Sequence, residues 1–158
     1  MNTRVFPDSA VELRPLDVSH YDLVNSLQQQ DDVWEFIGTL PLPQEEDEHH
    51  LFAIMEGQVS VGFAGLVRSR ALDGNDFELL CAVRSEAQLR GIAKHACELV
   101  LRWAFQTAKL ERVIACIEDS NAAARAIAVK LGMKEFGPTP PARTVYVKDR
   151  DEPSPTSA

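Results

Sequence analysis

Residues 77–93, FELLCAVRSEAQLRGIA, predict a strand, a short polar loop and the start of a helix. The run from Phe77 to Val83 is apolar apart from Glu78 and contains neither Gly nor Pro, as is typical of a strand covered on both faces. We therefore expect a central strand. The loop then leads through Gly91 into a long amphipathic segment, which places several backbone N–H groups and the positive end of a helix dipole at one spot. An anion, most naturally a phosphate, is expected there.

Two segments resemble the signature motifs of the GCN5-related N-acetyltransferase (GNAT) family. Gln88-x-x-Gly91-x-Ala93, after an apolar strand, is similar to the family's Q/R-x-x-G-x-G/A motif. Residues 121–133, NAAARAIAVKLGM, resemble its N-x-x-S/A…K-L-G-F segment and follow a second apolar strand at residues 112–118. Within the family, the sequence is most similar to the branch that acetylates the N-terminal amines of ribosomal proteins. The resemblance is specific because both motifs occur in the right order, each on its predicted element.

The resemblance implies an α/β (α+β) fold with the three-layer GNAT architecture. In that architecture, helices flank a mixed, mostly antiparallel central sheet of about six to seven strands. The chain has 158 residues, 45% of them hydrophobic and 25% charged, which is the profile of one globular domain. We expect that domain to span residues 1–148. The polar, proline-rich residues 149–158 are expected to form a disordered tail.

Periodicity and turn residues predict the other elements. Further strands are expected at residues 11–16, 51–55, 59–67, 112–117 and 143–147, and helices at residues 19–30, 31–37, 92–110 and 121–132. Pro15 indicates the end of a strand or an edge of the sheet. Residues 56–58 favour a hairpin turn, and residues 137–141 are expected to break the chain before the last strand.

The net charge and the positions of the cysteines limit the classes of function that we expect. A formal net charge of −8 disfavours nucleic-acid binding and would attract a cationic acceptor. The three cysteines, Cys81, Cys97 and Cys116, lack C-x-x-C spacing and lie in apolar segments, so we expect reduced core thiols in a cytoplasmic protein. His49 and His50 are adjacent and would point apart, so no metal site is predicted. No segment has the features of a signal peptide or a membrane span.

By resemblance the cosubstrate is acetyl-CoA. Backbone N–H groups of the loop and first helical turn are expected to bind its pyrophosphate, and a Cβ at position 91 would hold the phosphates away from the main chain. The resemblance implies that the pantetheine enters a wedge between the central strand and the next parallel strand. The predicted cofactor-binding residues are Cys81, Ala82, Val83, Gln88, Leu89, Arg90, Gly91, Ile92, Ala93, Lys94 and Asn121. Two plainer interpretations stay open: Gly91 as a phosphate-free helix cap, and Asn121 as an ordinary N-cap.

Two residues are candidates for acid–base chemistry. Glu78 is the predicted general base, because it is the only ionisable group in an otherwise apolar strand, where partial burial would raise a carboxyl pKa. The alternative is a solvent-facing residue at a strand end, and Glu118 is the second choice of base. Relatives place Tyr or Ser where this chain has Ala124 and Ala128, so Tyr146 or a water is the expected proton donor to the leaving thiolate. A backbone N–H near Val83 is the expected oxyanion donor.

The leading prediction is an acetyl-CoA-dependent N-acetyltransferase that acts on a primary amine by direct transfer in a ternary complex. The acceptor is expected to be a small molecule or a peptide, with no nucleic acid, membrane or metal involved. The sequence does not identify the acceptor, and it is compatible with a homodimer. One alternative is a non-catalytic acyl-CoA-binding or sensor module on the same fold, and another is a nucleotide-binding regulator.

Overall fold

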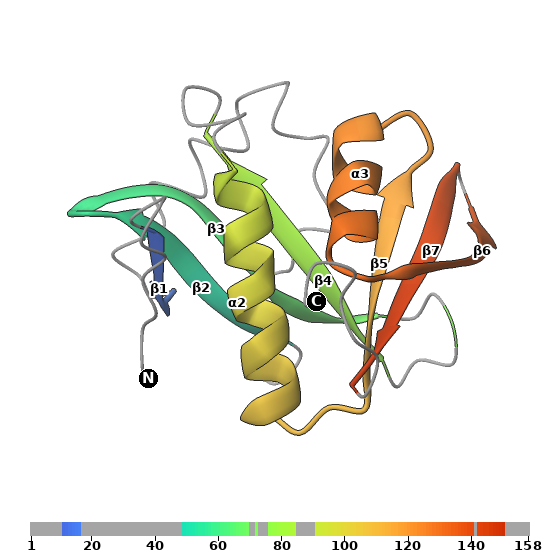
Figure 1. The fold of residues 1–158 in the computed structure, drawn as a ribbon, viewed down its shortest axis with the longest axis horizontal. Helices are drawn as coiled ribbons and strands as arrows, with labels where there is room; N and C mark the ends of the chain where they lie inside the picture. Colours follow the sequence, from blue (N-terminus) through green and yellow to red (C-terminus); the bar gives the residue numbers. More distant parts are fainter. Residues whose placement is uncertain are drawn as a thin grey trace.

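The computed structural model describes residues 11–16, 49–69, 72, 76–84, 91–140 and 142–150. Within them, seven strands form one sheet in the order β1-β2-β3-β4-β5-β7-β6 (Figure 1). The strands are β1 (Val11–Pro15), β2 (His49–Glu56), β3 (Val59–Ser69), β4 (Asp76–Val83), β5 (Arg112–Glu118), β6 (Lys134–Thr139) and β7 (Arg143–Asp149). The strands β4 and β5 are parallel, and every other neighbouring pair is antiparallel. The predicted mixed, mostly antiparallel sheet is confirmed.

The fourth strand, β4, is the central one, as predicted. All eight of its residues are buried. Because successive side chains of a strand point to opposite faces, Leu79 packs into the large core cluster and Leu80 into a smaller cluster on the other face. Such burial on both faces explains why this stretch of sequence lacks the alternation of a half-exposed strand.

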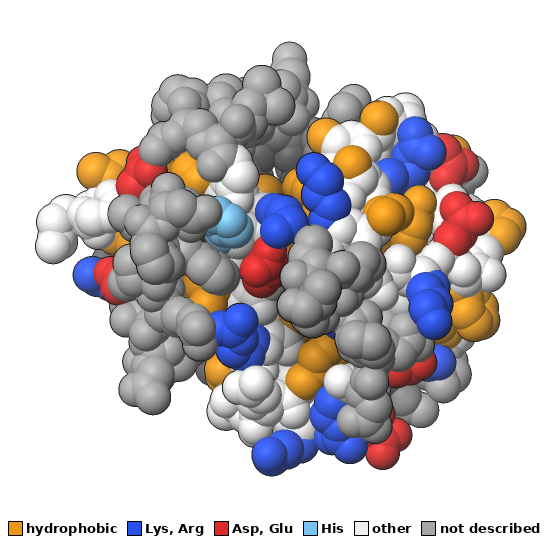
Figure 2. Space-filling view, in the orientation of Figure 1, with side chains coloured by type: hydrophobic (Ala, Val, Ile, Leu, Met, Phe, Trp, Pro, Cys, Tyr) orange, Lys and Arg blue, Asp and Glu red, His pale blue; other side chains and the backbone are white. Residues whose placement is uncertain are grey.

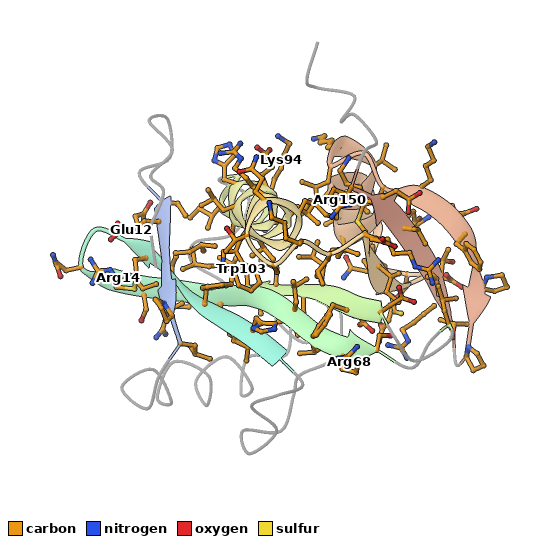
Figure 3. All side chains as sticks on the ribbon, turned by 90° about the horizontal axis from the view of Figure 1, so that it is seen from below. Glu12, Arg14, Arg68, Lys94, Trp103 and Arg150 are labelled. Atoms are coloured by element: carbon orange, nitrogen blue, oxygen red, sulfur yellow. The ribbon has the colours of Figure 1, made fainter. Side chains whose placement is uncertain are left out.

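Two helices, α2 (Ile92–Gln106) and α3 (Ala122–Lys130), lie on the same face of the sheet (Figure 1). Figure 3 shows Trp103 between α2 and the sheet, whereas Lys94 points away from it. The Trp103 ring lies 5.4 Å from the ring of Phe52 on β2 in an edge-on contact. This aromatic contact anchors the C-terminal half of α2 on the sheet. The two helices predicted between residues 19 and 37 lie outside the described residues.

The end of α3 follows the predicted glycine signal. Gly132 adopts a left-handed conformation with φ of 88°. Its N–H donates to the Val129 carbonyl at 3.0 Å, and the Met133 N–H donates to the Ala128 carbonyl at 3.0 Å. This pair of bonds satisfies the last carbonyl groups of the helix, as in a Schellman motif.

The C-terminal part of the sheet differs from the prediction. The expected chain break at residues 137–141 is wrong for its first part, because Gly137 and Pro138 belong to β6. This strand is the last in the sheet, where a residue without an N–H is tolerated, and its register shifts between Glu135 and Gly137. The last strand extends to Asp149, and the Arg150 N–H donates to the Glu111 carbonyl at 2.9 Å. Residues 151–158 lie outside the described part.

An ion pair joins β4 and β5 at their beginnings. Nε of Arg112 lies 2.6 Å from Oδ1 of Asp76, and a second guanidinium nitrogen lies 2.7 Å from Oδ2. The Asp76 side chain is only 7% exposed, so this bidentate pair is well shielded on the carboxylate side. The starts of the two parallel strands are therefore held together.

Candidate functional site

The parallel pair β4 and β5 separates soon after it begins. Only Phe77 and Glu78 of β4 are in register with β5, opposite Val113 and Ile114. Both strands continue beyond these two pairs, β4 to Val83 and β5 to Glu118. Figure 1 shows the two arrows diverging from their starts. The backbones of these two adjacent strands therefore form a wedge within one sheet.

The pairing of β3 with β4 determines which backbone groups face this wedge. The Arg84 N–H donates to the Val61 carbonyl at 2.7 Å, and the register from there back to Asp76 is unbroken. Since hydrogen-bonded and non-hydrogen-bonded pairs alternate in an antiparallel ladder, Ala82 directs its backbone groups to β3. Cys81 and Val83 direct theirs to the β5 side. Of the three predicted pantetheine contacts, these two therefore have the required orientation and Ala82 does not.

The first turn of α2 lies at the open end of the wedge (Figure 1). Gly91 is its N-cap, with φ of 77° and ψ of 5°, and a Cβ built there would meet nothing within 4 Å. Glycine is thus favoured by the backbone conformation, and the space beside it is open. The first turn contains Lys94 and no acidic residue. Ile92 is buried in the core, and Gln88, Leu89 and Arg90 lie outside the described residues.

A second helix N-terminus lies at the same end, because α3 begins shortly after β5 ends (Figure 1). Asn121 is its N-cap, and Oδ1 accepts from the Ala124 N–H at 3.0 Å. The N-cap interpretation of Asn121 is therefore confirmed, and Asn121 is buried between the end of β5 and the start of α3. The positive ends of two helix dipoles thus lie at the same end of the wedge, and they favour an anionic ligand there.

Basic side chains also gather near this end. Figure 2 shows Lys and Arg side chains over the N-terminal half of α2 and towards α3. The Lys94 Nζ lies 2.6 Å from Oε1 of Glu98, one turn later on the helix. The carboxylate of Glu98 offsets the positive charge of Lys94 in this partly exposed pair. The main-chain N–H groups are therefore the better candidates for contacts with an anion.

Glu78 is buried, with only 4% of its surface exposed. The alternative of a solvent-facing residue is therefore wrong. Its side chain lies on the face of the sheet away from α2, because its neighbours Phe77 and Leu79 face the helix. Glu118, the second choice of base, is exposed at the end of β5.

Tyr146 lies on β7 and faces α2 and α3, so Glu78 and Tyr146 are on opposite faces of the sheet. It is paired with Ala115 of β5. Burial raises the pKa of Tyr146, and the nearby carboxylate of Glu135 adds to this, while Arg125 lowers it. A phenol with a raised pKa stays protonated at neutral pH and can donate a proton.

Comparison with known proteins shows the family of this chain. Residues 10–134 match the family described as the acetyltransferase (GNAT) domain. The chain belongs to the GNAT family. This match covers most of the chain and includes the strand–loop–helix unit around Gly91.

Solved structures share this GNAT fold at low sequence identity. The ribosomal-protein-S5-alanine acetyltransferase of Vibrio fischeri is 13% identical, with a TM-score of 0.74 over 96% of this chain and 98% of that one. RimJ of Mycobacterium smegmatis, solved in complex with CoA-disulfide, is 16% identical, with a TM-score of 0.73 over 94% and 86%. A spermidine N-acetyltransferase variant of Vibrio cholerae is 13% identical, with a TM-score of 0.72 over 89% and 94%. No curated protein matches the sequence significantly.

Two classes of site receive no support from the described residues. They contain no group of three or more His, Cys, Asp or Glu side chains that could hold a metal ion. Neither described helix has the length and apolar character needed to cross a bilayer. Instead, His50 packs its ring 5.1 Å from that of Trp103.

The sequence prediction missed two polar neighbours of Glu78. Ser69 on β3 and Cys116 on β5 are both buried, and Cys116 interacts with both Glu78 and Ser69. The two-residue alternation of β5 places Cys116 on the same face as Ile114, but only the strand register brings that face next to Glu78. The spacing of motifs in the sequence therefore could not predict this cluster.

Two glycines of β3 provide a test of the wedge. A Cβ at Gly62 would overlap the Ala82 carbonyl oxygen and lie 2.9 Å from Cα of Val83. We expect Gly62→Ala to destabilise the fold by about 1–3 kcal/mol through overpacking, and also to weaken CoA binding by displacing β4 at the wedge. Urea unfolding and titration calorimetry with CoA measure the two effects.

Gly65→Ala is the matched control for this variant. Its Cβ would overlap the His50 carbonyl oxygen and lie 2.9 Å from Cα of Leu51, so the clash has the same form but falls on β2. We expect a similar loss of stability with unchanged CoA affinity, measured at a temperature where both variants are folded. Equal CoA affinity in both variants would contradict the assignment of the β4 end to the binding site.

Proposed function

We propose that this protein is an acetyl-CoA-dependent N-acetyltransferase that transfers the acetyl group directly to a primary amine in a ternary complex. The observation that carries the proposal is the early end of the β4–β5 ladder, after two residue pairs. It leaves main-chain groups of Cys81 and Val83 directed into an opening between the strands. An extended amide chain such as pantetheine can pair with such groups as an added strand would.

The residues at the open end fit the anionic part of the same ligand. Gly91 leaves open space beside the main chain at the start of α2, and the first turn has no acidic side chain. Backbone N–H groups from about residue 91 to Lys94 are therefore proposed to bind the pyrophosphate. The buried Asn121 is proposed to line the opposite side of the wedge.

The chain's own groups supply the proton transfers of the reaction. Glu78 is proposed to accept a proton from the substrate ammonium, directly or through a water, so that the free amine attacks the thioester carbonyl carbon. Attack forms the N–C bond and a tetrahedral oxyanion, whose collapse then breaks the C–S bond, and the sulfur leaves with its electron pair as thiolate. The Val83 N–H is proposed to stabilise the oxyanion between these two events. The second proton of the nitrogen is proposed to pass through a water or Tyr146 to this thiolate. Acetyl-CoA supplies only the activated acyl group.

This chain differs from its relatives at the positions that would protonate the leaving thiolate. Ala124 and Ala128 carry no donor and are both buried against the sheet. Tyr146 remains a prediction for this role, since it faces the same helix and keeps its proton at neutral pH. A thiol with an unperturbed pKa of about 8.5 also leaves without such help. The absence of a hydroxyl at these two positions is the observation that favours the second candidate function, a non-catalytic acyl-CoA-binding module.

The acceptor is proposed to be a cationic small molecule or the amine of a peptide, since the net charge of −8 attracts such groups. We propose a cytoplasmic location, in keeping with the thiol state of Cys81, Cys97 and Cys116, which are buried without disulfides. Nucleic acid and membrane are not proposed as partners, and a homodimer is compatible with the proposal.

A substrate screen tests the proposed function. The purified chain is incubated with isotope-labelled acetyl-CoA and separate pools of polyamines, amino acids, amino sugars and peptides with free N-termini. We expect release of CoA thiol together with one acetylated product, identified by mass spectrometry. Tight CoA binding without transfer to any pool would favour the non-catalytic module. Binding of ATP in preference to CoA would favour a nucleotide-binding regulator and overturn the proposal.

A further inference from the structure

A band of polar side chains crosses the sheet on the face away from α2 and α3. It runs from Ser69 on β3 through Glu78 on β4 and Cys116 on β5 towards Arg143 on β7. The first three are 5%, 4% and 3% exposed, respectively. Apolar residues flank this band, with Leu80 and Ala82 in one buried cluster and Ile114 and Val145 in another. Burying a carboxylate in such surroundings is costly unless donors compensate it.

The strand register places Cys116 beside Glu78. Glu78 is opposite Ile114 in the parallel ladder, and Cys116 is the next residue of β5 on the same face. The ladder ends at this pair, so Cys116 lies on the wedge side of Glu78. Its cross-strand neighbour on the other side is Val145 of β7. The thiol therefore lies on the divergent part of β5, on the wedge side of the carboxylate.

Glu78 and Ser69 are the polar neighbours that act on the Cys116 thiol. Burial raises the pKa of Cys116 to about 12, and the charge and hydrogen bond of Glu78 add to this rise. Arg143 and a hydrogen bond from Ser69 lower it. Since the thiol is neutral at physiological pH, its S–H is a donor and the carboxylate is the acceptor. Of the other charged groups on this face, Asp76 and Arg112 form an ion pair at the start of the two strands, and Glu118 and Arg143 lie opposite each other at the end of β5.

We propose that Cys116 is a positioning residue for Glu78: its thiol donates a hydrogen bond to the carboxylate and holds it facing the wedge, and Ser69 in turn orients the thiol. The inference rests on the proposed function of Glu78 as the base. A donor to the carboxylate stabilises its charged form, so the bond also lowers the pH at which Glu78 becomes an active base. Neither Ser69 nor Cys116 touches the reacting atoms in this arrangement.

The test compares Cys116→Ala, which lacks the donor, with Cys116→Ser, which keeps one. In Cys116→Ala we expect kcat/KM to fall roughly 10-fold through misorientation of the carboxylate, with unchanged CoA affinity. The acid limb of the pH–rate profile should move up by about one pH unit. Carboxyl NMR of glutamate-labelled protein without CoA should show the same shift in the Glu78 titration. Cys116→Ser should restore most of the rate and the wild-type titration.

Val145→Ala is the matched control, because it creates a cavity next to Cys116 on the same face and removes no donor. We expect it to destabilise the fold about as much as Cys116→Ala while leaving the pH profile unchanged. The same profile and Glu78 titration in Cys116→Ala as in wild type would overturn the inference. If wild type transfers acetyl to no amine but Glu78 still titrates differently in Cys116→Ala, the proposed function fails while the Cys116–Glu78 contact stands.

Discussion

Gly91→Glu is expected to weaken CoA binding by about 100-fold or more, close to 3 kcal/mol, while the protein still folds. The new side chain would occupy the open space beside the main chain and place a negative charge at the positive end of α2. Both effects exclude a phosphate from the backbone N–H groups. Titration calorimetry with CoA measures the affinity, and thermal unfolding shows whether the variant is folded.

Gly57→Glu is the control for the cost of the backbone conformation. Gly57 lies in the turn between β2 and β3, has φ of 64°, and likewise has nothing within 4 Å of an added Cβ. A non-glycine residue in this conformation costs about 1–2 kcal/mol at either position. We therefore expect equal destabilisation of the two variants and wild-type CoA affinity in Gly57→Glu. Unchanged affinity in well-folded Gly91→Glu protein would remove the start of α2 from the binding site.

Glu78→Gln is expected to lower kcat at neutral pH by about 100-fold or more, within the range that a general base contributes. The amide has nearly the same shape but accepts no proton. In wild type the rate falls as the pH drops through the titration of the base, because the protonated carboxyl no longer accepts a proton. This acid limb should disappear in Glu78→Gln, and CoA affinity should stay the same. Steady-state kinetics across pH and calorimetry give both readouts.

Glu118→Gln makes the same change at the second candidate base. Glu118 is exposed at the end of β5, whereas Glu78 is buried next to Cys116. Loss of the acid limb in Glu118→Gln, with a normal profile in Glu78→Gln, would transfer the role of base to Glu118. A normal profile in both variants would show that neither carboxylate sets the pH dependence.

Several features of the fold were predictable because they depend on residues close together in the chain. The apolar run at residues 77–83 predicts a strand buried on both faces, and all of β4 is buried. Gly91 and Gly132 mark a helix start and a helix end, and both adopt the left-handed conformation. The N-cap at Asn121 is equally local, since its side chain bonds the N–H three residues later.

The edge strand β6 shows where local signals mislead. Gly137 and Pro138 favour a chain break when only their neighbours are considered. In the folded chain they pair with β7 at the edge of the sheet, where the missing N–H of proline is not needed. The position of a strand within the sheet, which no short stretch of sequence encodes, decided this outcome.

The sequence alone determined most of the described strands, both described helices and the glycines at the helix ends, because periodicity and capping act within a few residues. It indicated the family through the resemblance of two short motifs. Tertiary structure alone decided how the site is built. The divergence of β4 from β5, the direction of the Ala82 backbone groups towards β3, and the contact of Glu78 with Cys116 all follow from strand register. Register joins residues that are distant in the chain, such as Phe63 with Ala82 and Phe77 with Val113, and it is selected by the packing of the whole sheet rather than by any one segment.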